Sequence, residues 1–109
     1  MELSEKKCVP CEGGVFPLAR QESEPLLRQI NGWQLSEDAL SISKTFAFKD
    51  FAQSLAFADK IGEIAEQEGH HPDLHVSWGS LKVDLTTHAI GGLSENDFIL
   101  AAKIDKISQ

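Results

Sequence analysis

The sequence HVSWGSLKVDLTTH, residues 75–88, decides the fold of this chain of 109 residues. Apolar residues at 81, 83 and 85 alternate with polar residues through His88, which is typical of a strand with one buried face. Residues 75–78 predict the preceding strand, and Gly79-Ser80 predicts the tight turn between the two. The stretch therefore predicts an antiparallel hairpin with one face against a core.

A long helix precedes this hairpin. Apolar residues recur at helical spacing over residues 51–65, and Asp50 with Gln53 resembles a variant capping box at the start. The helix is expected to end at Gly69, because Pro72 cannot continue it. It is the longest helix that the sequence predicts.

The remaining segments complete a second hairpin and two further helices. Residues 33–35 and 40–48 predict two strands, and a short helix is expected to begin at Ser23, with Pro25 near its start. A last helix begins at the capping box of residues 94–97. The order of helix, two strands, helix, two strands and helix predicts an α+β fold, in which a four-stranded antiparallel sheet carries three helices on one face.

Residues 1–22 differ in composition from the rest and predict an irregular N-terminal arm, with a single domain at 23–109. The arm holds both cysteines of the chain, in the motif Cys8-x-x-Cys11. One such pair is half of a zinc site. We interpret the two cysteines as reduced thiols, with a metal or redox role as the alternative.

The composition excludes several classes of protein. Hydrophobic residues are 41% of the chain and charged residues 25%, which is ordinary for a globular domain. No apolar run is long enough to span a membrane, and the first residues do not resemble a secretory signal, so a cytoplasmic protein is expected. The net charge of −7 opposes binding to nucleic acid through its phosphates.

All four histidines lie between residues 70 and 88. Imidazole gives and takes protons near neutral pH. Glu66 and His70 are four residues apart and would share a helix face, so the carboxylate is expected to orient that ring. His71 follows at the helix end and His88 at the strand end. The pattern predicts that three imidazoles meet at one cleft, which suits general acid–base catalysis.

Each of these residues also has a purely structural interpretation. A helix C-terminus favours histidine through its dipole alone, and Asp97 occupies the third position of a capping box. Glu66 can be an exposed helix carboxylate, Trp78 a core residue and His75 a surface residue of a strand. No HExxH motif is present, and no metal site is predicted; a zinc protein using Cys8, Cys11 and histidines is the alternative.

The combined pattern resembles the pterin-4a-carbinolamine dehydratase family. The resemblance covers about residues 23–107. It is carried by Glu66-x3-His70-His71-Pro72, Trp78, Thr87-His88 and Gly91-Gly92-Leu93-Ser94-x2-Asp97. Leu74 departs from the pattern, because many relatives carry an aromatic residue there.

The resemblance implies a lyase that dehydrates 4a-hydroxytetrahydropterin to quinonoid dihydropterin and so recycles the cofactor of aromatic amino-acid hydroxylases. It also implies homodimers or homotetramers, a pterin substrate, and no metal or organic cofactor. By position, His70, His71 and His88 would be catalytic, with Glu66, Asp97 and Trp78 binding substrate or supporting the site.

We expect His70, oriented by Glu66, and His88 to share the proton transfers, while His71 binds or assists. We expect Trp78 to pack beneath the site. The alternative function is a dehydratase-like module that binds or assembles another protein, or that acts in another pterin pathway.

Overall fold

The computed structural model describes residues 2–9 and 16–108. Its helices are α1 (Arg20–Leu27), α2 (Phe51–Glu68) and α3 (Glu95–Ile107), and its strands are β1 (Gln34–Leu35), β2 (Ile42–Ala47), β3 (Asp73–Ser77) and β4 (Ser80–Leu85). Two short 3₁₀ turns, Leu3–Glu5 and His88–Ile90, complete the regular structure of this part of the chain.

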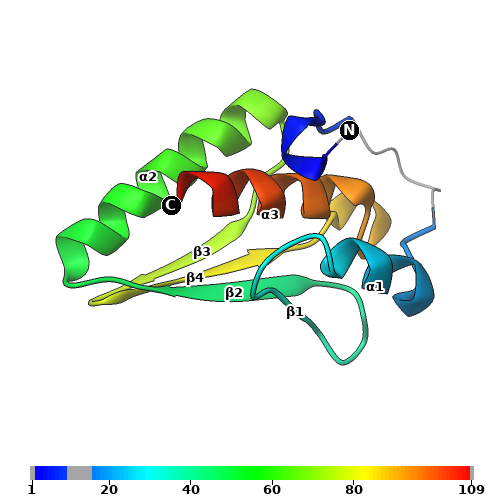
Figure 1. The fold of residues 1–109 in the computed structure, drawn as a ribbon, viewed down its shortest axis with the longest axis horizontal. Coiled ribbons are helices and arrows are strands. Elements are labelled where there is room, and N and C mark those ends of the chain that lie inside the picture. Colours follow the sequence, from blue (N-terminus) through cyan, green and yellow to red (C-terminus); the bar gives the residue numbers. More distant parts are fainter. Residues whose placement is uncertain (1, 10–15, 109) are drawn as a thin grey trace.

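The four strands form one antiparallel sheet in the order β1-β2-β4-β3. The hairpin β3-β4 pairs through β4 with β2, so that Leu81 faces Phe46 and Leu85 faces Ile42. In Figure 1, α2 and α3 lie side by side above the sheet, and α1 lies beside the end of α3. The predicted α+β fold, a four-stranded antiparallel sheet with three helices on one face, is confirmed.

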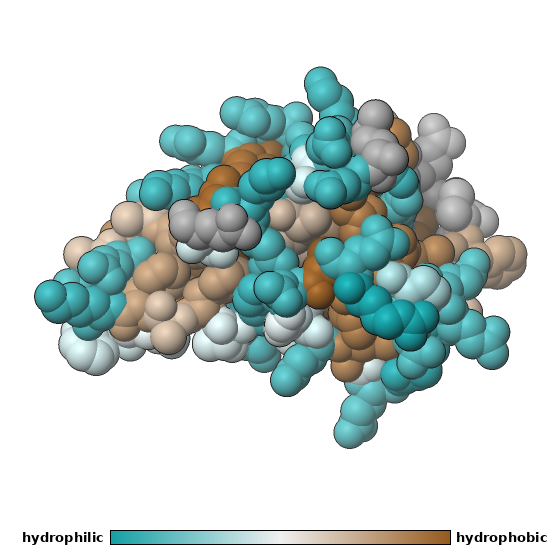
Figure 2. All heavy atoms as spheres, viewed as in Figure 1, coloured by the Kyte–Doolittle hydropathy of each residue, from teal (hydrophilic) through white to brown (hydrophobic). Residues whose placement is uncertain are grey.

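The core lies between the sheet and the helices. Its fully buried side chains come from every layer, since β4 contributes alternate residues and α3 contributes one continuous stripe. The largest of them include Ile42, Ile61, Leu81, Leu85, Phe98, Leu100 and Ile104. Hydrophilic side chains cover most of the outline in Figure 2, with apolar atoms visible between them. No helix of the described part of the chain is long and apolar enough to cross a membrane.

Lys44 interrupts the apolar face of β2, and the structure explains how. Its ammonium group lies 2.8 Å from the Asp105 carboxylate and donates to the carbonyl of Asn31 at 2.6 Å. Trp33 donates its indole N–H to the same carboxylate at 3.0 Å. The positive charge of Lys44 is therefore paired with a carboxylate at the edge of the core. A partly buried cation requires such a partner.

The first helix begins earlier than the sequence predicts. It starts at Arg20 instead of Ser23, because the side chain of Glu22 accepts the backbone N–H of Ala19 at 2.8 Å and caps this end. Ser23 is therefore a fully buried residue inside α1 instead of its cap. Pro25 lies inside the helix instead of at its start.

The described part of the N-terminal arm packs against the domain. Leu3 is buried in the core beside α3, and Lys103 of that helix donates to the carbonyl of Ser4 at 3.0 Å. Farther along, the backbone N–H of Leu18 donates to the carbonyl of Leu93 at 2.8 Å. Cys11 and Gly13-Gly14 lie outside the described residues.

Candidate active site

The three predicted histidines meet in one cleft at the end of the sheet. The cleft has a volume of about 210 Å³ and lies where α2 ends and where the chain leaves β4. Its lining includes His70, His71 and His88 together with Val9, Gly69, Thr86, Thr87, Ala89 and Asn96. The geometric prediction, three imidazoles on one cleft, therefore agrees with the structure.

His70 reaches the cleft because the chain turns sharply at the end of α2. Gly69 adopts the left-handed conformation with φ of 64°, so His70 no longer follows the face of the helix. Its ring turns toward α3, and Nε2 lies 2.6 Å from Oδ1 of Asp97. The expectation that Glu66 orients His70 is wrong, because that expectation assumed a continuous helix through residue 70.

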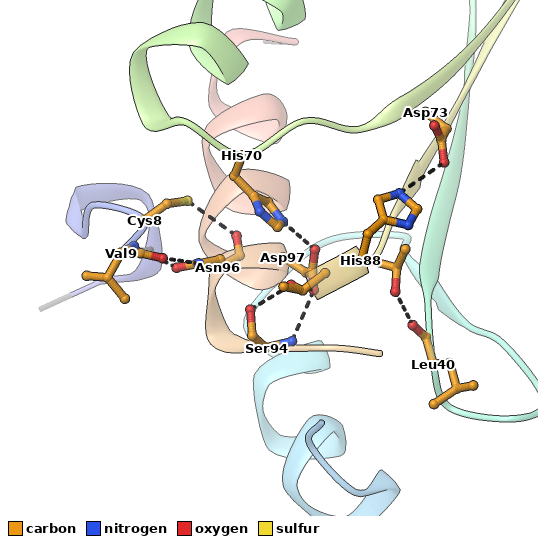
Figure 3. A network of polar contacts seen from close by, with 11 residues as sticks. Cys8, Val9, Leu40, His70, Asp73, His88, Ser94, Asn96 and Asp97 are labelled. Atoms are coloured by element: carbon orange, nitrogen blue, oxygen red, sulfur yellow. Dashed lines mark hydrogen bonds and ion pairs between the residues drawn. The ribbon is translucent and has the colours of Figure 1, made fainter. Parts of the chain in front are cut away.

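Asp97 holds His70 from a fully buried position at the start of α3. Its Oδ2 atom accepts the hydroxyl of Thr87 at 2.8 Å and the backbone N–H of Ser94 at 3.0 Å (Figure 3). The Ser94 hydroxyl lies 2.8 Å from the Thr87 hydroxyl and can donate to it in turn. Asp97 thus caps the start of α3 and also holds His70, while its role in the reaction stays a prediction.

These contacts select one tautomer of His70. A carboxylate that accepts hydrogen bonds on both oxygens is satisfied in its ionised form. His70 then donates its Nε2–H to Asp97, and the lone pair of the neutral ring is on Nδ1. A nearly buried imidazole oriented by a buried carboxylate is the arrangement that general bases use.

Glu66 pairs with the next residue instead. Its carboxylate forms a short contact with Nε2 of His71, and both side chains are largely exposed. An exposed pair of this kind contributes little to stability. Its effect is on the orientation of the His71 ring at the rim of the cleft.

His88 forms the outer side of the cleft. It opens the 3₁₀ turn after β4 instead of ending the strand, because Thr87 turns the chain by bridging to Gly92. Its Nε2 atom lies 3.9 Å from the Asp73 carboxylate, and its side chain is 74% exposed. Figure 3 shows His88 and Asp73 on the opposite side of His70 from Cys8 and Val9. The His88 ring is therefore open to solvent.

Two residues that the sequence analysis considered for the site, His75 and Trp78, lie away from the cleft. His75 is on the open face of the sheet, 3.1 Å from the Asp84 carboxylate. Trp78 is at the turn between β3 and β4 and is 74% exposed. Since Asp73 begins β3 at the cleft and Trp78 follows its other end, the expectation that Trp78 packs beneath the site is wrong for the single chain.

The sequence did not reveal Val9 and Asn96 as cleft residues. Asn96 stands beside the capping residue Asp97, which was the only available signal, and Val9 carried none. Thr87 was part of the quoted motif, but nothing in the sequence showed that its hydroxyl would bind Asp97.

Cys8 lies near the cleft but has the properties of an unreactive thiol. Burial, together with the nearby Glu68 carboxylate, raises the pKa of Cys8 to about 12. Within residues 2–9 and 16–108, no group of three or more His, Cys, Asp or Glu side chains is arranged to hold a metal ion. Cys11 is outside these residues, and the absence of a metal requirement stays a prediction.

Fold and site together define an α+β protein with a buried histidine–aspartate pair and two further imidazoles in one cleft. The model of the family described as pterin 4 alpha carbinolamine dehydratase matches residues 16–107. The chain belongs to this family.

Curated relatives match the chain over almost its whole length. One from Nitrosomonas eutropha is 51% identical over 107 residues, which cover 97% of this chain and 93% of the relative. One from Rickettsia canadensis is 55% identical over 104 residues, which cover 94% of each chain. Both are named, provisionally, as pterin-4-alpha-carbinolamine dehydratases.

Solved structures share the fold. A transcriptional coactivator/pterin dehydratase from Brucella melitensis is 31% identical, with a TM-score of 0.80 over 85% of this chain and 99% of that one. A pterin dehydratase-like protein identified as a RuBisCO assembly factor in the alpha-carboxysome is 24% identical, with a TM-score of 0.61 over 72% of this chain and 90% of that one. The second likeness shows the fold alone.

Proposed function

We propose that this chain dehydrates 4a-hydroxytetrahydropterin to quinonoid dihydropterin by histidine acid–base catalysis. The observation that carries the proposal is the His70–Asp97 pair, which opens on a cleft with His71 and His88. Membership in the dehydratase family supports the pterin as substrate.

The reaction asks for two proton transfers. The bond between C4a and the hydroxyl oxygen breaks, and the oxygen takes a proton to leave as water. N5 loses its proton, and the electron pair of that N–H bond forms the N5=C4a double bond. The substrate therefore needs a proton donor near one atom and an acceptor near the next, with no covalent intermediate.

His70 is suited to accept the proton from N5. Its Nδ1 atom carries the lone pair when Nε2–H is held by Asp97. The imidazolium that forms is stabilised by the same buried carboxylate, without any movement of the side chain. Thr87 and the N–H of Ser94 hold that carboxylate in place.

His88 is suited to donate the proton to the leaving hydroxyl. It is exposed, lies on the same cleft, and has the Asp73 carboxylate 3.9 Å from its Nε2 atom. His71 is steadied by Glu66 at the rim and assists binding. In this scheme the residues themselves supply the acid and the base, so no cofactor takes part.

In the cell, the activity would regenerate the pterin cofactor of aromatic amino-acid hydroxylases. The proposal includes a cytoplasmic location and a homodimer or homotetramer, both carried over from the resemblance and from the composition of the chain. Analytical ultracentrifugation of the purified chain tests the oligomeric state.

The ultraviolet absorbance of freshly generated 4a-hydroxytetrahydropterin tests the activity. Its decay is compared without protein, with the wild type, and with His70→Ala and His88→Ala, after correction for spontaneous dehydration. We expect each variant to lose about 10²- to 10⁴-fold of the catalysed rate. His75→Ala is the matched control, because His75 is an exposed histidine outside the cleft, and it should retain full activity.

Two outcomes would contradict the proposal. If both His70→Ala and His88→Ala retain full activity, the assigned histidines do not carry the proton transfers. If the folded wild type does not accelerate the decay, the chain is not a dehydratase for this substrate, and the binding-module alternative takes its place.

A further inference from the structure

The arm places one of its own residues in the wall of the cleft. Val9 lines the cleft together with the histidines. It lies outside residues 16–107, the segment that the family model matches. The cleft of this chain therefore includes a residue that the family model does not match.

A pair of hydrogen bonds holds Val9 in that place. The side-chain amide of Asn96 accepts the backbone N–H of Val9 at 2.9 Å and donates to its carbonyl at 2.6 Å. An amide that binds both backbone groups of one residue imitates the pairing of a neighbouring strand. Asn96 precedes Asp97 in the sequence, so the arm is held directly beside the carboxylate that orients His70.

Three further contacts fix the arm before Val9. The backbone N–H of Cys8 donates to the Glu68 carboxylate at 2.8 Å, and its thiol contacts the carbonyl of Asn96 at 3.6 Å. Lys103 lies 3.8 Å from Glu68 and binds the carbonyl of Ser4. The arm is thus fixed at successive points along α3 and at the end of α2; Figure 3 shows the contacts of Cys8 and Val9 with Asn96.

We propose that Val9 is a specificity-determining residue that contacts the bound pterin, and that Asn96 is the positioning residue that holds it there. The identity of the ligand rests on the proposed function. Val9 is 64% exposed in the free protein, which leaves surface of this apolar residue for a ligand to cover.

The position of Val9 indicates which step it affects. In Figure 3, Val9 and His88 lie on opposite sides of His70. A pterin that spans the cleft presents its reacting atoms to the histidines, while Val9 contacts a part that does not react. Contacts with such a part are equal in the ground and transition states, so they change KM and leave kcat unchanged.

Steady-state kinetics on the full chain tests the proposal, with calorimetric binding of 7,8-dihydrobiopterin as a second readout. We expect Val9→Ala to raise KM and the Kd of dihydrobiopterin by about 3- to 10-fold, as for a partial loss of two buried methyl groups, with kcat unchanged. Asn96→Ala should raise both by the same factor. The double variant should add nothing further, because Asn96 acts through Val9.

Hydrogen exchange separates positioning from a general effect on the fold. The Val9 amide should lose its protection in Asn96→Ala and keep it in Val9→Ala, since only the first substitution removes the acceptor. Lys7→Ala is the matched control, because Lys7 is an exposed residue of the same arm that does not line the cleft. It should change neither KM nor exchange.

The outcomes distinguish this proposal from the proposed function. An unchanged KM in Val9→Ala, in an enzyme that His88→Ala inactivates, overturns the role of Val9 and leaves the dehydratase intact. If the wild type is inactive, the dehydratase proposal fails. The calorimetric Kd of dihydrobiopterin then decides. If the ligand binds Val9→Ala more weakly than the wild type, the proposed role of Val9 is supported. If the Kd is unchanged, or if the ligand does not bind the wild type, that role is overturned.

Discussion

Asp97 has two roles in one side chain: it stabilises the start of α3, and it orients His70. One carboxylate oxygen caps α3 through the N–H of Ser94 and binds Thr87, while the other orients His70. The carboxylate is fully buried and every one of its partners can donate. A buried charge is tolerated only when it is satisfied in this way.

The isosteric change Asp97→Asn separates the capping of α3 from the effect of the carboxylate on His70. The amide oxygen can still accept the hydrogen bonds of Thr87 and Ser94, but the NH₂ group then faces His70 and cannot stabilise an imidazolium. We expect kcat to fall roughly 10²- to 10⁴-fold. Circular dichroism should show the same helical content as the wild type. A kcat within twofold of the wild type would show that His70 needs no carboxylate.

Cys8 yields a second prediction for a single residue. Its pKa is raised from 9.0 to about 12 by burial, so at pH 8 its thiolate is roughly a thousandfold scarcer than for a free cysteine. In a Cys11→Ser background, we expect Cys8 to react correspondingly slowly with a thiol reagent in the folded protein and at the ordinary rate in urea. Equal rates in both would show that the thiol is not shielded.

The raised pKa also fixes a direction for stability. The folded state binds the thiol proton more tightly than the unfolded chain does, so this contribution is present below about pH 9 and is lost as the pH rises toward 12. The free energy of unfolding of the Cys8→Ser variant should therefore depend less on pH in that alkaline range.

Among the elements, the exit from α2 decides where the active histidine lies. The periodicity of the sequence predicted the sheet and all three helices, because alternation and helical spacing are local signals. The partner of His70 could not be predicted in that way. It depends on the left-handed conformation of Gly69, which redirects the ring toward a residue 27 positions farther along the chain.

The same reasoning explains the other differences between the sequence-based predictions and the structure. The start of α1 moved because the side chain of Glu22 caps Ala19, and sequence alone favoured the better-known cap Ser23. Val9 and Asn96 are 87 positions apart, so no local pattern could join them. Local structure was therefore predictable, whereas contacts made by loops and by the arm were not.

Two glycines, Gly62 within α2 and Gly69 directly after it, test the role of the helix exit. Apart from its chain neighbours and the nearby backbone of its own helix, a Cβ added at Gly69 or Gly62 meets no atom within 4 Å, so neither substitution by alanine creates a clash. Gly69→Ala should still cost about 1–2 kcal/mol in the free energy of unfolding, because φ is 64° there. Gly62→Ala, in the helix interior, should stabilise by about 0.5–1 kcal/mol.

Urea unfolding of the two variants measures both effects. A destabilised Gly69→Ala with reduced dehydratase activity would link the helix exit to the placement of His70. If Gly69→Ala is as stable as the wild type, the left-handed turn is not required by the fold.

For the molecule as a whole, the arm is a structural part of the domain. Leu3 is buried in the same core as α3 and the sheet, although it stands at the third position of the chain. We expect Leu3→Ala to lower the free energy of unfolding by about 2–4 kcal/mol, as for a buried leucine. Urea denaturation measures this value, and Lys7→Ala should leave it unchanged. A loss below about 0.5 kcal/mol would show that the arm is not part of the cooperative unit.

The contacts of α3 have a consequence for how the protein is made. Three contacts join early residues to residues of α3. Lys103 binds the carbonyl of Ser4, which lies 99 positions earlier in the chain. Asn96 binds Val9, and Asp97 binds His70. Translation delivers these partners last, so the N-terminal arm and the cleft cannot assemble while the ribosome is still making the sheet. A message cut short before residue 94 yields a chain that keeps Glu66 beside His71 but lacks Asp97, the partner of His70, so early termination leaves no product with a complete site.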